Sequence, residues 1–163
     1  YQSTRILVWK DPWAYRQEGG YQIIQSLYAI GSGGLLGLGL GKSRQKFLYL
    51  PEPENDFIFA IVCEELGYIG AAVVILLFVL LIIRGYWLAV HARDRFGALL
   101  VVGITTLLAV QVFLNISVVT NLLPTTGISL PFFSYGGTAL MIQLAEMGMV
   151  LSVSRQIPAP KQE

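Results

Sequence analysis

Basic side chains alternate in a glycine-rich stretch that ends at an aspartate ahead of a long apolar run. Lys42, Arg44 and Lys46 lie in GLGLGKSRQKF, and Asp56 ends the following segment LYLPEPEND. Arginine and lysine bind phosphate oxygens, and a carboxylate can take a proton from a hydroxyl group. Together they suit a reaction on a lipid-linked pyrophosphate, in which Asp56 activates an acceptor alcohol. Binding of lipid headgroups by a cationic loop is the alternative that the residues leave open.

The glycines of this stretch do not have the spacing of a nucleotide-binding loop. A phosphate-binding loop requires G-x-x-x-x-G-K-[ST]. Residues 41–43 supply its end, but the first required glycine falls at Leu36. The G-x-G-x-x-G fingerprint also fails, because the glycines of residues 37–41 are two residues apart. We interpret them instead as positions where the backbone turns with a positive φ or approaches another segment closely.

The composition indicates a membrane protein. The chain has 163 residues, of which 55% are hydrophobic and 13% are charged, whereas soluble domains carry about 25% charged residues. A net charge of +1 gives no electrostatic argument for a nucleic-acid partner. Cys63 is the one cysteine and His91 the one histidine, which excludes an internal disulfide and argues against a multi-histidine metal site. Cys63 is expected to be a small core residue.

Three apolar runs predict three membrane-spanning helices. Residues 66–83 carry no charge and, together with residues 57–65, predict a first span over 57–83. Two further runs predict spans over 97–120 and 135–154, the last with Glu146 as its one acid, expected to serve helix packing. No internal repeat relates them.

Residues 1–56 hold most of the charge and one amphipathic segment, YQIIQSLYAI over residues 21–30. Its two faces carry Tyr21, Ile24, Leu27 and Tyr28 on one side and Gln22, Gln25 and Ser26 on the other. This pattern predicts a short helix that lies either in a membrane interface or against the rest of the protein.

Short basic loops remain in the cytoplasm, and the loop 84–96 carries Arg84, Arg93 and Arg95 against one acid. Three spans then place residues 1–56 and the loop 121–134 outside the membrane, and the tail 155–163 in the cytoplasm.

Two acids fall at the start of the first predicted span. Glu64 and Glu65 lie about two turns into it, and Glu64 shares a stripe with Asp56 if the helix already runs through Asp56. An ionisable group in a membrane helix normally faces a partner or a cavity. We expect one glutamate to be structural, and a functional role for the other is open.

The segment NLLPTTGISLPFFSYGG, residues 121–137, has two prolines and three glycines and cannot be regular helix throughout. Irregular backbone at membrane depth requires protein or a wet cavity around it. We expect it to roof a pocket beside the loop 37–56, an ordinary connector being the alternative.

Four motifs resemble the SEDS family (the FtsW, RodA and SpoVE proteins), and more its FtsW/SpoVE branch. They are DPW at 11–13, GGYQIIQSLYAIGSGG at 19–34, GLGLGKSRQKFLYLPEPENDFIFAIVCEELGYIG at 37–70 and GISLPFFSYGGTAL at 127–140. The resemblance covers nearly the whole chain. It implies an all-α polytopic membrane protein of the bacterial inner membrane, with the chain corresponding to the last large extracytoplasmic loop and final three of ten spans.

The resemblance also implies a function. The family polymerises lipid II into glycan strands for division, elongation or sporulation, together with a class B penicillin-binding protein and other divisome or elongation-complex proteins. Its essential acid corresponds to Asp56, the base on the 4-hydroxyl of the acceptor sugar; C1 of the donor is attacked with inversion and undecaprenyl pyrophosphate leaves. The sequence departs from the family in the residues before this acid, Glu54 and Asn55. It also lacks the family's front half, so the 163 residues alone are expected to be inactive.

The expected binding residues follow from charge and proximity to Asp56. We expect the pyrophosphate to be bound by Lys42, Arg44, Gln45 and Lys46, and either the sugar or the pyrophosphate to be contacted by Gln22, Gln25 and Ser26. Glu64 or Glu65 is expected either to adjust the acidity of Asp56 or to pair with a basic residue. The wall of the cavity is expected to be formed by Ser134, Tyr135, Gly136 and Gly137. The sequence contains no metal-ligand cluster; a divalent cation bound by pyrophosphate stays open, without support from the residues.

Two other functions compete with the enzyme. A lipid II flippase needs a polar path across the bilayer, so Glu64, Glu65 and Glu146 would matter more than Asp56. A non-catalytic scaffold for a penicillin-binding protein would tolerate Asp56→Asn but not changes of surface apolar residues in the spans. The bases and Asp56 lie together on one side of the membrane, which favours the enzyme.

Overall fold

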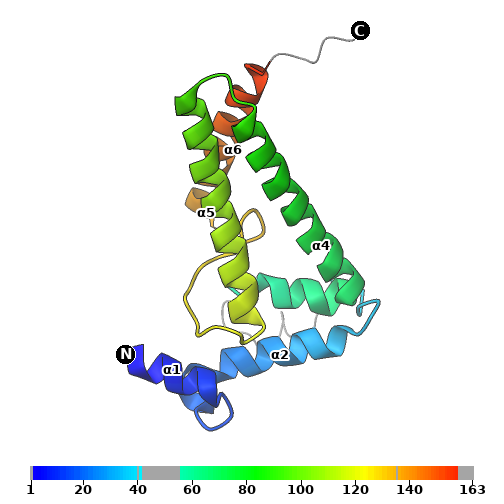
Figure 1. Cartoon of the computed structure of the whole chain (residues 1–163). Coiled ribbons are helices and arrows are strands. Elements are labelled where there is room, and N and C mark those ends of the chain that lie inside the picture. The colour runs from blue at the N-terminus through cyan, green and yellow to red at the C-terminus, as the bar shows by residue number, and fades with distance from the viewer. Residues whose placement is uncertain (1, 40, 42–55, 135, 158–163) are drawn as a thin grey trace.

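The computed structural model describes residues 2–39, 41, 56–134 and 136–157, which form helices and connecting turns without a β-strand. The chain is drawn from N- to C-terminus in Figure 1. Its helical elements are α1 (Gln2–Lys10), the short π-helix η1 (Arg16–Gly20), α2 (Tyr21–Gly33), α4 (Ile58–Val90), α5 (Arg95–Val119) and α6 (Gly137–Arg155).

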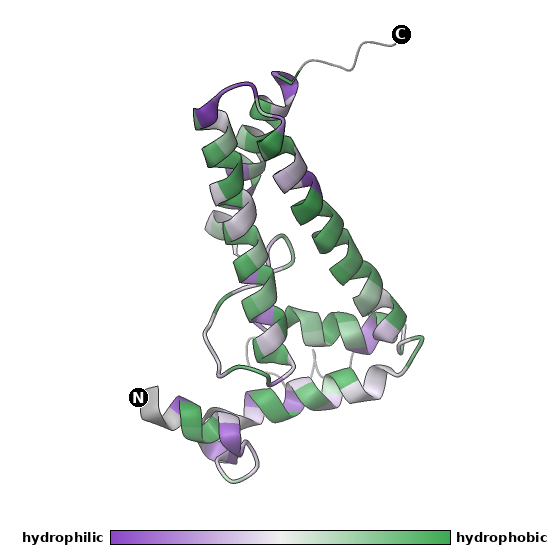
Figure 2. Ribbon diagram, in the orientation of Figure 1, coloured by the Kyte–Doolittle hydropathy of each residue, from purple (hydrophilic) through white to green (hydrophobic). Residues whose placement is uncertain are grey.

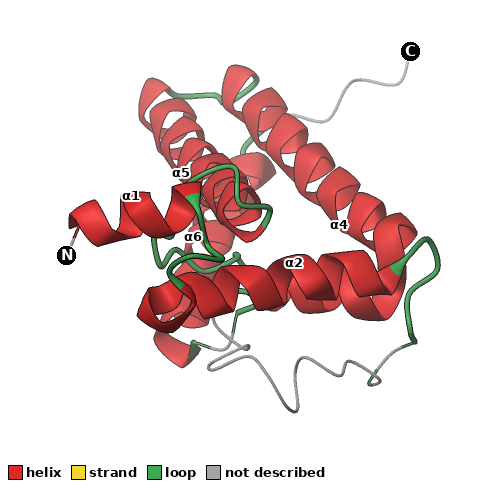
Figure 3. Cartoon of the chain, turned by 90° about the horizontal axis from the view of Figure 1, so that it is seen from below, coloured by secondary structure: helices red, strands yellow, loops and turns green. Residues whose placement is uncertain are grey.

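Three of the described helices, α4, α5 and α6, are long and apolar enough to cross a membrane. Figure 2 shows apolar residues along most of their length. Helix α5 packs more closely on α4 than on α6, and the seam is tight at Gly85, where an added Cβ would overlap the side chain of Thr105. Seen from the end in Figure 3, α2 lies across the beginning of α4 and near the end of α5, with α1 beside it. The chain is therefore an all-α polytopic membrane protein.

Helix α4 is broken at Gly67, and this break corrects the expectation of one continuous helix from residue 57. Gly67 has φ 68° and ψ −171°, which lies outside the helical region. A short segment over 58–66 runs beside α2, and the chain then turns sharply into the long segment over 68–90 (Figure 1). At 1.5 Å per residue, residues 68–90 extend about 33 Å, which suffices for a hydrocarbon core of about 30 Å.

The turn after α2 satisfies the backbone groups that this break exposes. The donors are the N–H groups of Leu38, Gly39, Tyr68 and Ile69, and the acceptors are, in the same order, the carbonyls of Glu64, Glu65, Gly34 and Leu35, at 2.9, 3.0, 2.9 and 3.3 Å. A helix interrupted inside apolar surroundings would otherwise leave unpaired polar groups, each costly when buried. The turn therefore replaces the hydrogen bonds that the helix loses.

Three glycines allow this junction to close. An added Cβ on Gly33 would overlap the carbonyl oxygen of Cys63, one on Gly37 the carbonyl oxygen of Glu65, and one on Gly67 the backbone of the α2 turn. Gly37 also has φ 77°. Gly37 of the glycine-rich stretch thus has both features that the sequence suggested, close backbone approach and a positive φ.

Helix α2 lies against the protein, with a buried face that differs from the predicted apolar one. Ile24 is buried as its apolar character suggests, but Tyr28 is half exposed, and Gln25 and Ser26 of the predicted polar face are buried. The hydroxyl of Ser26 lies 2.8 Å from the carbonyl of Ile23 and 3.2 Å from that of Val119 in α5. Because Ser26 finds backbone acceptors inside, burial of this polar position does not leave it unsatisfied.

The uncharged run ends at residue 83, but helix α4 continues to Val90. Only residues 91–94 therefore connect α4 to α5. Asp94 begins α5 as its N-cap, and its Oδ2 accepts a hydrogen bond of 2.8 Å from the Gly97 N–H. The guanidinium of Arg84 lies 4.3 Å above the ring of Trp87 in the last turns of α4. The basic connection of the sequence is thus mostly helix.

Candidate functional site

Asp56 is half-buried and lies two residues before α4 begins. The beginning of α4 lies at the end of the molecule that also carries α1 and α2, and the connection 91–94 with Arg93 lies at the opposite end (Figure 1). The backbone carbonyl of Asp56 accepts a hydrogen bond of 2.8 Å from Nδ2 of Asn115 in α5. The candidate acid is therefore tied to a spanning helix other than its own.

The loop over residues 121–136 is inserted between the helices. The ring of Phe133 lies 6.0 Å from the ring of Phe78, which is 11 residues beyond the break at Gly67 and hence about 16 Å further along the helix. Phe132 and Phe133 line a 190 Å³ cavity with residues of this middle part of α4. Phe132 and Phe133 of the loop thus reach into the depth of the bundle. That the loop also roofs a pocket beside residues 37–56 stays a prediction, because most of those residues lie outside the described ones.

Two buried amides satisfy the backbone of this inserted loop. Nδ2 of Asn115 donates to the carbonyl of Ile128, and Oε1 of Gln143 in α6 accepts from the N–H of Phe132, both at 2.8 Å. Asn115 is 1% exposed and Gln143 is 9% exposed. Irregular backbone at membrane depth is tolerated only where protein or water satisfies its polar groups, and these amides do so.

Helix α1 holds the beginning of the same loop. Nε1 of Trp9 donates to the carbonyl of Asn121, and a guanidinium nitrogen of Arg5 donates to the carbonyl of Thr125, both at 3.1 Å. Asn121 has φ 59°, which gives the chain its turn out of α5. The loop is therefore bound by side chains from α1, α5 and α6.

Gly127 faces the carboxylate of Asp56. An added Cβ on Gly127 would lie 3.7 Å from Oδ2 of Asp56, and Gly127 is itself exposed with φ 72°. A larger residue would be strained at this φ and would stand against the carboxylate. The exposed glycine therefore lies beside the carboxylate without a side chain between its backbone and Oδ2.

The structure brings some of the sequence-predicted site residues to this end of the molecule, beside the break in α4. Glu64 is 1% exposed, whereas Glu65 is half-buried. Both belong to the short segment before Gly67, not to the long rod of α4 as the sequence suggested. Their carbonyls hold the turn from which the basic stretch departs.

The predicted polar residues of α2 differ in their exposure. Ser26 is fully buried in the contact with α5, Gln25 is 7% exposed, and Gln22 is half-buried. Ser134 is half-buried, and its hydroxyl group donates a hydrogen bond of 3.1 Å to the carbonyl of Leu130. Contact of any of these with a substrate stays a prediction. Five further expected residues lie outside the described residues, namely Lys42, Arg44, Gln45, Lys46 and Tyr135.

Asn115 and Gln143 were missed in the sequence, although each is an amide within an otherwise apolar predicted span. A polar side chain in a membrane helix usually has a partner in the bundle, and that signal was available. Oδ1 of Asn115 is buried and has no hydrogen-bond partner in the described part of the chain. What the sequence could not supply is the identity of the two backbone carbonyls that its Nδ2 binds.

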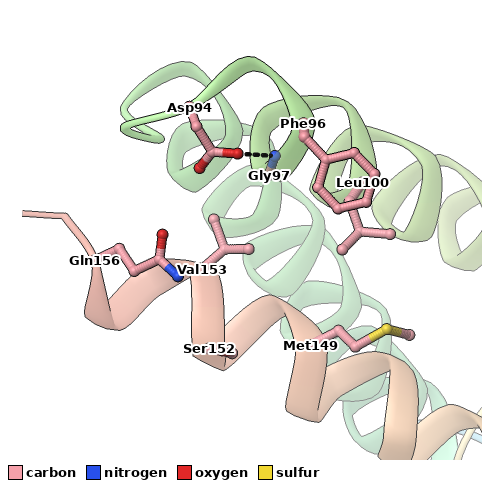
Figure 4. Close-up of a pocket in the computed structure, with 8 residues that line it drawn as sticks. All are labelled: Asp94, Phe96, Gly97, Leu100, Met149, Ser152, Val153 and Gln156. Atoms are coloured by element: carbon pink, nitrogen blue, oxygen red, sulfur yellow. Dashed lines mark hydrogen bonds between the residues drawn. The ribbon is translucent and has the colours of Figure 1, made fainter.

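The described residues contain no cluster of three His, Cys, Asp or Glu residues that could hold a metal. A 290 Å³ pocket at the opposite end, between the start of α5 and the end of α6, contains one acid, Asp94 (Figure 4). That carboxylate is occupied by capping Gly97. The lining is otherwise mainly apolar, so this pocket does not have the groups for catalysis.

The chain resembles known proteins over nearly its whole length. The FtsW/RodA/SpoVE family model, described as "Cell cycle protein", matches residues 1–158. Stage V sporulation protein E of Bacillus subtilis is 54% identical over 155 residues, covering 95% of this chain and 42% of that protein. A "Probable peptidoglycan glycosyltransferase FtsW" of Geobacter metallireducens is 48% identical, covering 96% and 42%. The chain thus spans less than half the length of these relatives.

Two solved structures have the same fold. A chain of the structure "Structural coordination of polymerization and crosslinking by a peptidoglycan synthase complex" aligns with a TM-score of 0.74 and 32% identity, covering 98% of this chain and 43% of that chain. The rod shape-determining protein RodA of Thermus thermophilus aligns with a TM-score of 0.63 and 34% identity, covering 83% and 41%.

Proposed function

Because the chain belongs to the FtsW/RodA/SpoVE (SEDS) family of cell cycle proteins, we propose that it carries the catalytic acid of a peptidoglycan glycosyltransferase and that this acid is Asp56. The name of the FtsW relative supports the reaction class. The observation that carries the assignment is the place of Asp56, which is half-buried just before α4 with the exposed Gly127 beside its carboxylate.

The reaction joins two lipid II molecules. The 4-hydroxyl of the acceptor sugar attacks C1 of the donor, a C1–O4 bond forms, and the bond from C1 to the pyrophosphate oxygen breaks with inversion. Asp56 takes the hydroxyl proton, and undecaprenyl pyrophosphate leaves with the electron pair. General-base catalysis supplies about 10²–10⁴-fold, so positioning and stabilisation of the leaving charge must supply the rest. Lys42, Arg44, Lys46 and Gln45 are the residues proposed for that charge.

The placement of the glutamates favours this enzyme over a flippase. A flippase needs polar groups along the whole path between the two sides of the membrane. Glu64 and Glu65 lie before the break at Gly67, at the same end of the molecule as Asp56. The long segment over 68–90 carries Arg84 as its one charged residue, near the opposite end.

We further propose the orientation and the partners. The end with Arg93, Arg95 and Arg155 faces the cytoplasm by the positive-inside rule, and the Asp56 end then faces outward, where the glycan is built. A class B penicillin-binding protein is the proposed partner, supported by the likeness to a chain of a peptidoglycan synthase complex. Other division or elongation proteins of the membrane would join them.

The test is polymerisation of fluorescent lipid II by the protein in its full genomic length, with a transpeptidase-only partner. Asp56→Asn is compared with wild type and with Asp94→Asn, which makes the same chemical change at the opposite end and retains an N-cap side chain. We expect glycan strands from wild type and Asp94→Asn and none from Asp56→Asn at equal folded amounts. Strands from Asp56→Asn at the wild-type rate would refute the assignment.

The two competing functions give other outcomes. If neither wild type nor any variant makes glycan strands, but wild type moves lipid II across vesicle membranes, the chain belongs to a flippase. If no variant makes strands or moves lipid II, and Asp56→Asn still supports cross-linking by the partner, the chain is a scaffold.

A further inference from the structure

The side chain of Asn115 joins the two irregular segments that flank the candidate acid. Its Nδ2 donates one hydrogen to the carbonyl of Asp56 and the other to the carbonyl of Ile128, each at 2.8 Å. An amide nitrogen has two hydrogens to donate, so both are used. Both partners are acceptors, which means that only the nitrogen, and not the amide oxygen, suits this side.

The two carbonyls that Asn115 binds belong to the segment that bears Asp56 and to the segment that bears Gly127. Asp56 precedes the first residue of α4, so the helix does not fix its carbonyl. Ile128 directly follows Gly127, whose added Cβ would lie 3.7 Å from Oδ2 of Asp56. One side chain thus binds both the segment that bears the acid and the residue that follows Gly127.

We propose that Asn115 is a positioning residue for Asp56, holding the segment of the acid and the segment of Gly127 together through its two hydrogen bonds. This inference rests on the proposed function, in which Asp56 is the base. Asn115 is buried in α5, so it acts through the two backbone segments and does not itself touch the substrate. A displacement of about 1 Å can cost 10²-fold in rate, which is the scale of effect expected from its loss.

The experiment measures kcat and KM of lipid II polymerisation for the protein in its full genomic length. In Asn115→Ala we expect kcat to fall about 10–100-fold and KM to change less than about threefold, because positioning acts on the chemical step. The matched control is Asp94→Ala, which removes a part-buried hydrogen bond at the opposite end of the same helix. It should lower thermal stability while leaving kcat within about twofold of wild type.

Asp56→Asn in the same assay separates the two claims. If Asp56→Asn polymerises like wild type, the proposed function fails. If Asp56→Asn is inactive but Asn115→Ala retains its kcat, or if Asp94→Ala loses as much kcat as Asn115→Ala, the positioning role is overturned and the function stands.

Asn115→Ser tests the same inference with a milder change, since its hydroxyl retains one donor. It decides the matter if Asn115→Ala does not fold. The positioning role is supported if the folded Asn115→Ser variant has a kcat about fivefold or more below that of wild type. Where the kcat of Asn115→Ala can also be measured, the value for Asn115→Ser should lie between that value and the wild-type value. A kcat within about twofold of wild type, with Asp56→Asn inactive, contradicts it.

Discussion

Replacement of Gly67 by alanine tests whether the break in α4 depends on glycine. The backbone of Gly67, with φ 68° and ψ −171°, lies in a region that is nearly exclusive to glycine. Another residue there is strained by about 1–3 kcal/mol. The added methyl would also stand 2.6 Å from the carbonyl oxygen of Leu35. This oxygen accepts the hydrogen bond of Ile69 and cannot retreat without weakening it.

The magnitude follows from these two contributions. Loss or weakening of one or two of the junction's hydrogen bonds adds about 0.5–1.5 kcal/mol each to the backbone strain. The total for Gly67→Ala is about 2–5 kcal/mol. At about 2–4 °C per kcal/mol for a chain of this size, the melting temperature should fall by about 4–20 °C.

The assay is thermal unfolding of the purified protein in detergent, with Gly31→Ala as the matched control. Gly31 is an exposed position within α2, and an added Cβ there meets nothing within 4 Å. Alanine at a helical glycine stabilises by about 0.5–1 kcal/mol, so this control should melt at or above the wild-type temperature. A Gly67→Ala protein that melts with the wild type would refute the reasoning, because the break would then not require a glycine.

Two further substitutions test the local hydrogen bonds. Asp94→Ala removes the N-cap hydrogen bond to the Gly97 N–H and should lower the free energy of unfolding by about 0.5–2 kcal/mol. Asp94→Ser retains a capping hydroxyl group and should keep most of that stability. Equal melting temperatures of the Ala and Ser variants would show that the cap contributes nothing. Gln143→Leu leaves the N–H of Phe132 without its acceptor and should cost about 1–3 kcal/mol by thermal unfolding; a melting temperature equal to that of wild type would mean that the loop finds another acceptor.

The number and approximate limits of the long helices could be read from the sequence because apolarity over a membrane-length run is a one-dimensional signal. The end of the second run near Thr120 is where α5 ends, at Val119. The same signal concealed the break at Gly67, since LGYIG and the residues that follow it are apolar. Hydropathy reports which solvent a segment suits, and it does not report whether one segment continues straight into the next.

The surroundings of Asp56 were harder to predict than Asp56 itself. The acid stands out by its place between a basic stretch and an apolar run, whereas Asn115 and Ile128 lie 59 and 72 residues further along the chain. Their meeting depends on how α5 packs and how deeply the loop 121–136 inserts. Such contacts between distant residues are set by tertiary packing, for which periodicity along the chain gives no information.

The break at Gly67 also changes the route by which the long helices determine the position of the acid. If α4 were unbroken, the continuous backbone hydrogen bonds of the helix would connect the long segment over 68–90 directly to the segment that follows Asp56. These hydrogen bonds are interrupted at Gly67, and the short segment 58–66 is bound to the turn after α2 instead. The carbonyl of Asp56 is held by Asn115 of α5. The acid is therefore coupled to the membrane bundle through its neighbouring helix, and side chains of α5 matter more for its placement than those of the long part of α4.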